Sequence, residues 1–497
     1  MVPKRRPPNT VALMALSAIV LAGCAVGPDY HAPVLKTATE FHSASLLESR
    51  QITAAAPLEN WWVGFGDPTL ERVIDAAVRQ NLELAQAVAR VTQAGAITQS
   101  ARAALLPAGQ VSGQAATTHA SLEDPLGRLG SASPGFDRNG KLYNLGIGAS
   151  WEVDVFGGLR RGAEAAQADY ESAQAAASAA RLTIIAETAD TYLLLRTLQA
   201  RLALAQQQAA TQQHRVELAR LRYSRGIAPE LELRQAEGEL ATTAARVPQL
   251  EVGLVAARNG LDVLMGVAPG TEDAQLQNVA PIPAAPAVQT AGGPAALIRR
   301  RPDIVVAERK LAASNARIGE AVSDYYPKFS LSGLIGTATT AGGDVFTANT
   351  LLAQGVAGLH WRLFDFGRVD AEVKAAKGKN AEALAAYRQS VLVATEEVED
   401  ALTALVKLEA QEALLSNGEQ ALGRARESAL AAYQAGQQSY LQVLDADDRL
   451  QRTQDARIVA QSDAARAAVE TFRSLGGGWE PQMTHAETAA QSSARSQ

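Results

Sequence analysis

The chain lacks the residues that disulfide-bonded proteins and most enzymes depend on. Its 497 residues include one cysteine, Cys24, which excludes an internal disulfide and a metal site built from cysteines. The sequence has no nucleophile elbow, phosphate loop or dinucleotide fingerprint. Six histidines are scattered without ligand spacing: His31, His42, His119, His214, His360 and His485. We therefore expect no enzyme, with no catalytic residue, no metal and no bound cofactor.

Aromatic residues and an excess of positive charge are also missing. Aromatics make up 5% of the chain and charged residues 20%, while alanine is abundant. This composition is closer to that of long helices than to that of a β-rich core. The net charge is −6, and removing residues 1–23, which carry three positive charges and no negative one, leaves −9. Nucleic acid is therefore not an expected partner.

The N-terminus resembles a bacterial lipoprotein signal. Basic residues precede an apolar run at 11–22, which is too short for a membrane-spanning helix. The run ends in LAGC, which resembles a lipobox, so we expect cleavage before Cys24. A covalent lipid would follow, with diacylglycerol on the sulfur and an acyl chain on the new amino group; a chance cysteine is the alternative. Ala25, where an aspartate would retain a lipoprotein at the inner membrane, favours the outer membrane.

Proline is absent from two long stretches, 135–228 and 328–480. These gaps leave room for helices at about 162–225 and 370–435. At about 1.5 Å per residue, each helix would reach on the order of 95 Å. Helices of this length need partners along their whole course, because propensity alone does not hold them.

The ends and faces of these helices predict how they pair. Each ends near a glycine, Gly226 or Gly436, and a second helical pattern follows at once. Two antiparallel helical hairpins are therefore expected. The apolar stripe of Val398, Leu402 and Leu405 must be covered by other helices.

Before each long helix, the apolar residues change to a period of two. Residues 143–155 alternate apolar and polar side chains, and 108–118, 328–336 and 356–364 are similar. Segments of about ten residues with two different faces are typical of outer-membrane barrel strands, although a half-buried strand of a soluble sheet is the alternative. The aromatic residues at the strand ends fit an interfacial girdle or core packing: Trp151, Phe156, Trp361 and Phe366.

Four strands are too few for a closed barrel. A sheet in lipid must close to avoid unpaired edges, and the smallest closed forms use about eight strands. Several copies of the chain must therefore contribute strands to one barrel. The same symmetry would gather the long helices into a helical tube.

The two halves of the chain repeat each other. The pattern of Trp, four residues, Phe and Gly occurs at 151–157 and again at 361–367, which is 210 residues later. Upstream the offset is 220, so that Pro107 matches Pro327, and a longer loop in the first copy accounts for the difference. The pattern predicts a duplicated half of roughly two hundred residues. Each copy marks the place where a strand passes into a long helix.

Five segments together resemble the TolC-like outer-membrane factors, in the lipoprotein subgroup similar to OprM and NodT. The similarity extends over essentially all of the mature chain and in the expected order. The segments are CAVGPDYHAP (24–33), WWVGFGDPTL (61–70), RRRPDIVVAE (299–308), YYPKFSLSG (325–333) and AYQAGQQSYLQVLDAD (432–447).

This resemblance implies a fold, a function and partners. The fold would be a homotrimer with a twelve-stranded β-barrel in the lipid of the outer membrane, continuous with a twelve-helix tunnel in the periplasm. The function would be passive conduction of drugs or other small toxic molecules through the exit duct of a tripartite efflux pump. The partners would be a periplasmic adaptor (membrane fusion protein) and an inner-membrane transporter of the resistance-nodulation-division (RND) type.

The expected organisation follows the repeat. A signal peptide occupies 1–23, a lipidated arm with an equatorial segment 24–69, the first repeat 70–270, a Pro/Ala linker of the equatorial region 271–296, the second repeat 297–478 and a disordered tail 479–497.

The resemblance also implies a gate where the second hairpin turns. The matching residues are Tyr433, Gly436, Gln438, Gln442 and Asp445. Three copies of Asp445 would form a cation-selective ring in the lumen. The two glutamines stand where relatives often have charges, so amide hydrogen bonds would replace ion pairs.

Plainer interpretations of the same residues stay open. Tyr433 fits interhelical packing equally well. A solvated helix face is the alternative for Asp445, Asp447 and Asp448, since exposed ion pairs contribute only about 0–1 kcal/mol each.

The turn of the first hairpin is the expected docking surface for the adaptor, with Tyr223, Arg225 and Gly226. A purely geometric role in the turn is the alternative for Gly226 and for the following Pro229.

Two other functions compete with efflux. One is a structural coiled-coil lipoprotein that spans the periplasm, against which the four amphipathic strands argue. The other is a type I protein-secretion duct, which the lipobox and the motif GPDY at 27–30 disfavour. The exported substrate is not encoded in a recognisable motif.

Overall fold

The computed structural model describes most of the chain as two compact units. The described residues are 25–35, 38, 40–47, 57–271, 274–288, 293–340 and 346–479. Of these, 25–33, 92–172 and 308–385 form the first unit, and 34–91, 173–307 and 386–479 form the second. The predicted signal peptide, Cys24 and the tail from residue 480 lie outside the described residues.

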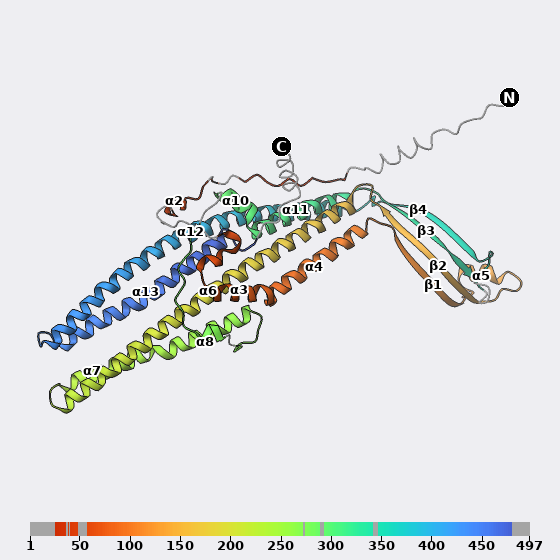
Figure 1. Cartoon of the computed structure of the whole chain (residues 1–497). Helices are drawn as coiled ribbons and strands as arrows, with labels where there is room; N and C mark the ends of the chain where they lie inside the picture. Colours follow the sequence, from red (N-terminus) through yellow and green to blue (C-terminus); the bar gives the residue numbers. More distant parts are fainter. Residues whose placement is uncertain are drawn as a thin grey trace, which may run out of the picture. The chain divides into compact units, whose positions relative to one another are not determined.

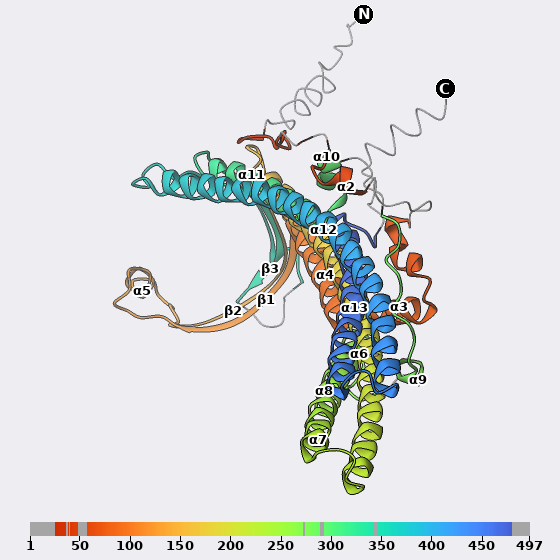
Figure 2. The same ribbon diagram turned by 90° about the vertical axis from the view of Figure 1, so that its left-hand side faces the viewer.

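The first unit contains one antiparallel sheet with the strand order β1-β2-β3-β4. Figure 2 shows that the sheet is curved. The strands β1 and β4 lie at its two edges, and within the described part of the chain each pairs with one neighbour. The bounds are β1 Ala108–His119, β2 Asn139–Val153, β3 Lys328–Thr339 and β4 Leu351–His360.

The register places the predicted apolar residues on one face of this sheet. Val111 lies opposite Ile147, which lies opposite Ile335 on its other side. All three side chains are more than 60% exposed in the single chain. The opposite face carries polar side chains, including Ser112, Asn144 and Ser332, as the period of two predicts. It is mixed, however, because Leu142 of β2 and both Leu352 and Val356 of β4 lie on it as well. Four more exposed apolar residues share the first face: Leu145, Leu331, Leu351 and Leu359.

Each repeat contains one helix of 67 residues, as the proline gaps predict. These are α6, Gly158–Ser224, and α12, Arg368–Gln434. Figure 1 shows each of them reaching a tight turn, after which the chain returns as a second helix. The returning helices are α7 (Glu230–Ala244) with α8 (Arg246–Leu264), and α13 (Tyr440–Ser474).

The returning helix differs between the repeats. In the second repeat, α13 is continuous over 35 residues. In the first repeat, the helix is interrupted at Ala245, three residues before Pro248. Proline cannot donate a backbone hydrogen bond, but it is accepted in the first turn of a helix, so a new helix starts just ahead of it.

The core of the second unit covers the predicted stripe of α12. Val398, Leu402 and Leu405 are fully buried. Trp61 stacks on Phe472 at a centroid distance of 5.3 Å. Two shorter elements also contribute buried residues to the second unit: η1 (Leu58–Phe65) and α3 (Pro68–Gln80).

The remaining helices are shorter than α6 and α12. Within the described part of the chain, no helix has both the length and the hydropathy needed to cross a membrane. These helices are α2 Ala44–Leu47, α4 Leu82–Ala103, α5 Pro125–Ser131, α9 Ala274–Gln277, α10 Gly293–Arg300 and α11 Pro302–Ser323.

Candidate functional site

The two hairpin turns have the same geometry. Gly226 and Gly436, which are 210 residues apart, both have a φ of +71°. In both turns, the N–H of the residue after the glycine donates to the carbonyl of the residue five positions earlier in the chain, at 2.9 Å. This closure satisfies the last carbonyls of the helix and requires a left-handed residue, which explains the glycines.

A polar and aromatic cluster joins the ends of the two hairpins within the second unit. Arg222, at the end of α6, forms an ion pair of 2.8 Å with Glu232 of α7. Its guanidinium also donates to the hydroxyl of Tyr433, at the end of α12. Tyr433 packs on Tyr440 of α13 at a centroid distance of 5.4 Å, and burial raises the pKa of Tyr440. The cluster therefore connects all four helix ends.

A buried carboxylate lies further along the same helices. Asp447 of α13 is only 5% exposed. It forms an ion pair with Arg215 of α6 and accepts a 3.0 Å hydrogen bond from Nε of Arg426 of α12. A buried charge is tolerated only with such partners, and removing one partner leaves the others uncompensated. Asp447 thus ties three long helices of one chain together.

More polar contacts link α6 to α13 beyond Asp447. They run in opposite directions along the two helices, as expected for an antiparallel pair. Two are bidentate Arg–Asp pairs, a geometry that fixes direction as well as distance. The contacts are Arg201–Asp455 (2.7 and 2.9 Å), Thr197–Ser462 (2.6 Å) and Arg466–Asp190 (2.6 and 2.9 Å).

The predicted gate residues divide into two groups in the single chain. Tyr433 and Gly436 belong to the turn and the cluster described above. The side chain of Asp445 is 60% exposed and pairs at 3.0 Å with Arg449 of its own helix. Within the described residues, the side chains of Gln438 and Gln442 are exposed and form no hydrogen bond. The predicted ring and amide contacts therefore concern neighbouring copies, and they stay predictions.

Sequence reasoning missed the buried Asp447 and its partners. A solvated helix face is the plainer interpretation of Asp445, Asp447 and Asp448, and it does not hold for Asp447. Asp448 pairs with Arg452 of its own helix at 2.8 Å, whereas Asp447 is buried. One signal was present: Asp447 lies four residues after Val443, so both are on one face of α13, and Val443 is buried.

The predicted docking tip is accessible in the chain. Tyr223 is 43% exposed and Arg225 is exposed as well. Below them, α6 and α7 hold each other through a small apolar cluster of Val216, Ala219, Leu233 and Ala236. The adaptor-docking role of this tip stays a prediction.

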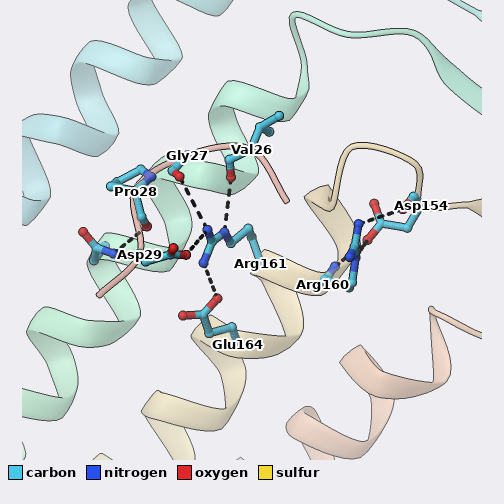
Figure 3. A network of polar contacts seen from close by, with 9 residues as sticks. Val26, Gly27, Pro28, Asp29, Asp154, Arg160, Arg161 and Glu164 are labelled. Carbon is cyan, nitrogen blue, oxygen red and sulfur yellow. Dashed lines mark hydrogen bonds and ion pairs between the residues drawn. The ribbon is translucent and has the colours of Figure 1, made fainter. Parts of the chain in front are cut away.

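The residues after Cys24 are fixed to the first unit by Arg161 (Figure 3). The side chain of Arg161 is 6% exposed. It donates to the carbonyl of Val26 at 3.2 Å and to the Asp29 carboxylate at 2.6 Å. The hydrogen bond from Arg161 holds the pKa of Asp29 below its ordinary value. Asn315 adds a 2.9 Å hydrogen bond to the carbonyl of Pro28.

Close packing explains the glycine of the GPDY motif. Gly27 has a φ of +91°, and a Cβ added there would lie 2.3 Å from the Cα of Gly319. Any other residue would clash with the helix α11. The segment that would carry the lipid is therefore seated by contacts at Val26, Gly27, Pro28 and Asp29, although Cys24 itself lies outside the described residues.

Comparison with known proteins agrees with this architecture. The chain matches the family model "Outer membrane efflux protein" at residues 73–267 and 294–477. It is 29% identical to nodulation protein T of Rhizobium leguminosarum bv. viciae, over 94% of this chain and 93% of the relative. It is 30% identical to the pyoverdine export outer membrane protein OpmQ of Pseudomonas putida, over 86% and 89%.

Solved structures show the same fold. The outer-membrane channel OprN is 31% identical, with a TM-score of 0.82 over 92% of this chain and all of that one. CusC is 24% identical, with a TM-score of 0.77 over 92% of this chain. The predicted fold, a β-barrel continued by a helical tunnel, is confirmed. The chain belongs to the outer membrane efflux protein family, and it is an outer-membrane exit duct of a tripartite efflux pump that reaches into the periplasm.

Proposed function

We propose that three copies of the chain form one passive duct for small molecules. The observation that carries this proposal is the sheet with two open edges and an exposed apolar face. In hydrocarbon, each unpaired backbone group costs several kcal/mol, so the edges of β1 and β4 must be paired. Three copies supply twelve strands, which close a barrel without an edge.

The proposed duct carries out no chemistry. The family consists of efflux channels, so we take conduction to be the whole activity, with no catalytic residue and no bound metal or cofactor. Relatives carry names as different as toluene efflux pump protein TtgI and cation efflux system protein CusC. The cargo therefore differs between relatives of one fold, and we assign this chain only small molecules delivered by its partners.

We propose a periplasmic adaptor and an inner-membrane RND-type transporter as these partners. The adaptor would dock on the hairpin turns, where Tyr223 and Arg225 are accessible beside Gly226. Docking in this place acts directly on the ends of the helices that close the tunnel. A modest difference in adaptor affinity between the closed and open states is enough to shift their populations.

The closed state would have two kinds of constraint. Within each chain, Asp447 holds α13 to α6 and α12 through Arg215 and Arg426. Between chains, the exposed Asp445 carboxylates would surround the lumen, where they attract cations. The hairpin α12–α13 cannot move away from α6 while the Asp447 pairs persist.

A covalent lipid on Cys24 would hold the N-terminus in the outer membrane. The seated segment after it, fixed by Arg161, supports this proposal because it leaves no long tether between lipid and protein. Diacylglycerol on sulfur with an N-acyl chain supplies two membrane signals, which suffice for stable anchoring.

The substitution Asp447→Asn tests the constraint within the chain. It leaves two partly buried arginines uncompensated, which costs about 3–5 kcal/mol in a fully buried pair. Even about 1.4 kcal/mol changes an equilibrium tenfold. We expect at least a tenfold higher open probability in planar lipid bilayers. Asp448→Asn is the matched control, because among the described residues Asp448 pairs with Arg452 of its own helix and with no other helix. Equal open probability for the two variants would contradict the constraint.

The substitution Asp445→Ala tests the duct and its cation preference together. We expect purified wild-type protein to form cation-selective channels in bilayers. The variant should conduct more and lose much of the preference, measured as the reversal potential across a salt gradient. No conductance from either protein would count against the duct. Unchanged conductance and preference in the variant would remove Asp445 from the lumen.

The intact mass of the protein from membranes tests the lipid. We expect a chain that begins at Cys24 and carries a diacylglycerol and one further acyl chain. Cys24→Ser should remove the added mass, and a wild-type protein without added mass would refute lipidation.

A further inference from the structure

The two repeats obey a register rule that the strand pairs confirm. In the first hairpin, Val111 of β1 lies opposite Ile147 of β2. Adding 220 to the first number and 210 to the second gives Leu331 and Ala357, which lie opposite each other in the second hairpin. The offsets read from the sequence thus map one hairpin onto the other residue by residue.

The same offsets predict a pairing that one chain cannot make. The repeats join within the chain through β2 and β3, where Ile147 lies opposite Ile335. Adding 210 to the number of Ile147 gives Ala357 of β4, and subtracting 220 from the number of Ile335 gives Ala115 of β1. These two strands are the separate edges of the sheet. A β1 strand next to β4 must therefore come from a second copy.

The side chains at the joint between the repeats show what should fill this contact. Phe156, just after β2, stacks on Tyr326, just before β3, at a centroid distance of 4.5 Å. Their equivalents in the repeat are Phe366 and Leu106. Phe366 is 100% exposed and Leu106 is 65% exposed. The phenylalanine ring that is half-buried in the first repeat is fully exposed in the second.

Equivalent hydrogen bonds lie next to Leu106 and Tyr326. Nε1 of Trp151 donates to the carbonyl of Leu105 at 2.9 Å, and Nε1 of Trp361 donates to the carbonyl of Tyr325 at 3.0 Å. These are equivalent bonds under the two offsets. Leu106 is therefore held at its end of β1 as Tyr326 is held at its end of β3.

The backbone of Phe366 has an unfavourable conformation. Among the described residues, Phe366 alone combines a side chain with a positive φ, +53°. Such a conformation is unfavourable for a bulky residue and persists only where the surroundings impose it. The Asp365 carboxylate imposes it here, since it accepts the N–H groups of Gly367 and Val369 at 3.1 and 3.0 Å. Three residues shortly before Phe366 in the sequence are also exposed and apolar: Trp361, Leu363 and Phe364.

We propose that β4 of one copy pairs with β1 of the next copy in the register that places Ala357 opposite Ala115, and that Phe366 packs on Leu106 of that neighbouring copy. The partner is a second copy of this chain, because its β1 edge and its Leu106 match the pairing that the chain already makes through β3 and Tyr326. This inference rests on the shared barrel of the proposed function and defines its contact surface.

Engineered cysteines test the register. Residues directly opposite each other have Cα atoms about 4.5–5.5 Å apart, within reach of a disulfide. We expect co-expressed, differently tagged chains with Ala115→Cys and Ala357→Cys to form a mixed covalent dimer on oxidation. The matched control pairs Ala115→Cys with Leu359→Cys, a shift by two residues that separates the side chains to about 7–8 Å. The only natural cysteine is Cys24, and both strands contribute alanines at the test positions.

The outcomes separate the register from the proposed function. A dimer from the 115/357 pair and none from the control supports the register. A dimer from the control alone overturns it. No dimer from a preparation that conducts ions in bilayers overturns the register and leaves the duct intact. No dimer together with no conductance overturns both.

The aromatic contact has its own test. Phe366→Ala should lower the temperature at which oligomers dissociate in detergent gels. Leu106→Tyr, which copies Tyr326, should raise it by restoring a stacked pair. If Phe366 faces lipid instead, Leu106→Tyr leaves the dissociation temperature unchanged, and the proposed contact is wrong.

Discussion

Unpaired backbone groups along the edges of β1 and β4 are the constraint on which the rest of this protein depends. Water can satisfy such groups at the edge of a soluble sheet, but hydrocarbon cannot. The sheet exposes its apolar face, with Val111, Ile147 and Ile335, so lipid is its natural surroundings. A single chain therefore cannot be the functional particle, and closure of the barrel depends on how copies of the chain meet.

Duplication makes this assembly simple to encode. Each repeat contributes a hairpin, an equivalent Trp-to-carbonyl hydrogen bond at its base and a 67-residue helix. The contact between repeats is made once inside the chain, where Phe156 meets Tyr326. Repeating it between chains closes the ring with near-equivalent joints. The sequence differs where the contact changes from internal to external, with Leu106 in place of a tyrosine.

Long helices rich in alanine bury little apolar surface per residue, so polar contacts set how they align. The bidentate pairs Arg201–Asp455 and Arg466–Asp190 fix α13 against α6. Asp447 adds a buried carboxylate shared by two arginines close to the hairpin turn. Separating a buried carboxylate from its arginines leaves uncompensated charges, which is costly. This position therefore suits a closed state that opens only when the adaptor docks.

The sequence predicted regular features well and tertiary features poorly. The long helices begin and end within four residues of the predicted limits, because missing prolines and terminal glycines act locally. Strand faces followed from the period of two. The contact of residues 26–29 with Arg161 depends on a helix distant in sequence, which no local pattern encodes. The spacing of Asp447 from Val443 indicates the buried face of α13, but the arginines that pair with Asp447 lie on α6 and α12. The roles of Gln438, Gln442 and Asp445 depend on neighbouring copies and stay predictions.

The number of chains per particle tests directly whether several copies share one barrel. Light scattering of the detergent-purified mature protein, corrected for bound detergent, gives this number. We expect three chains, which share one twelve-stranded barrel. A stable monomer would contradict it, because four strands with two open edges do not enclose a pore.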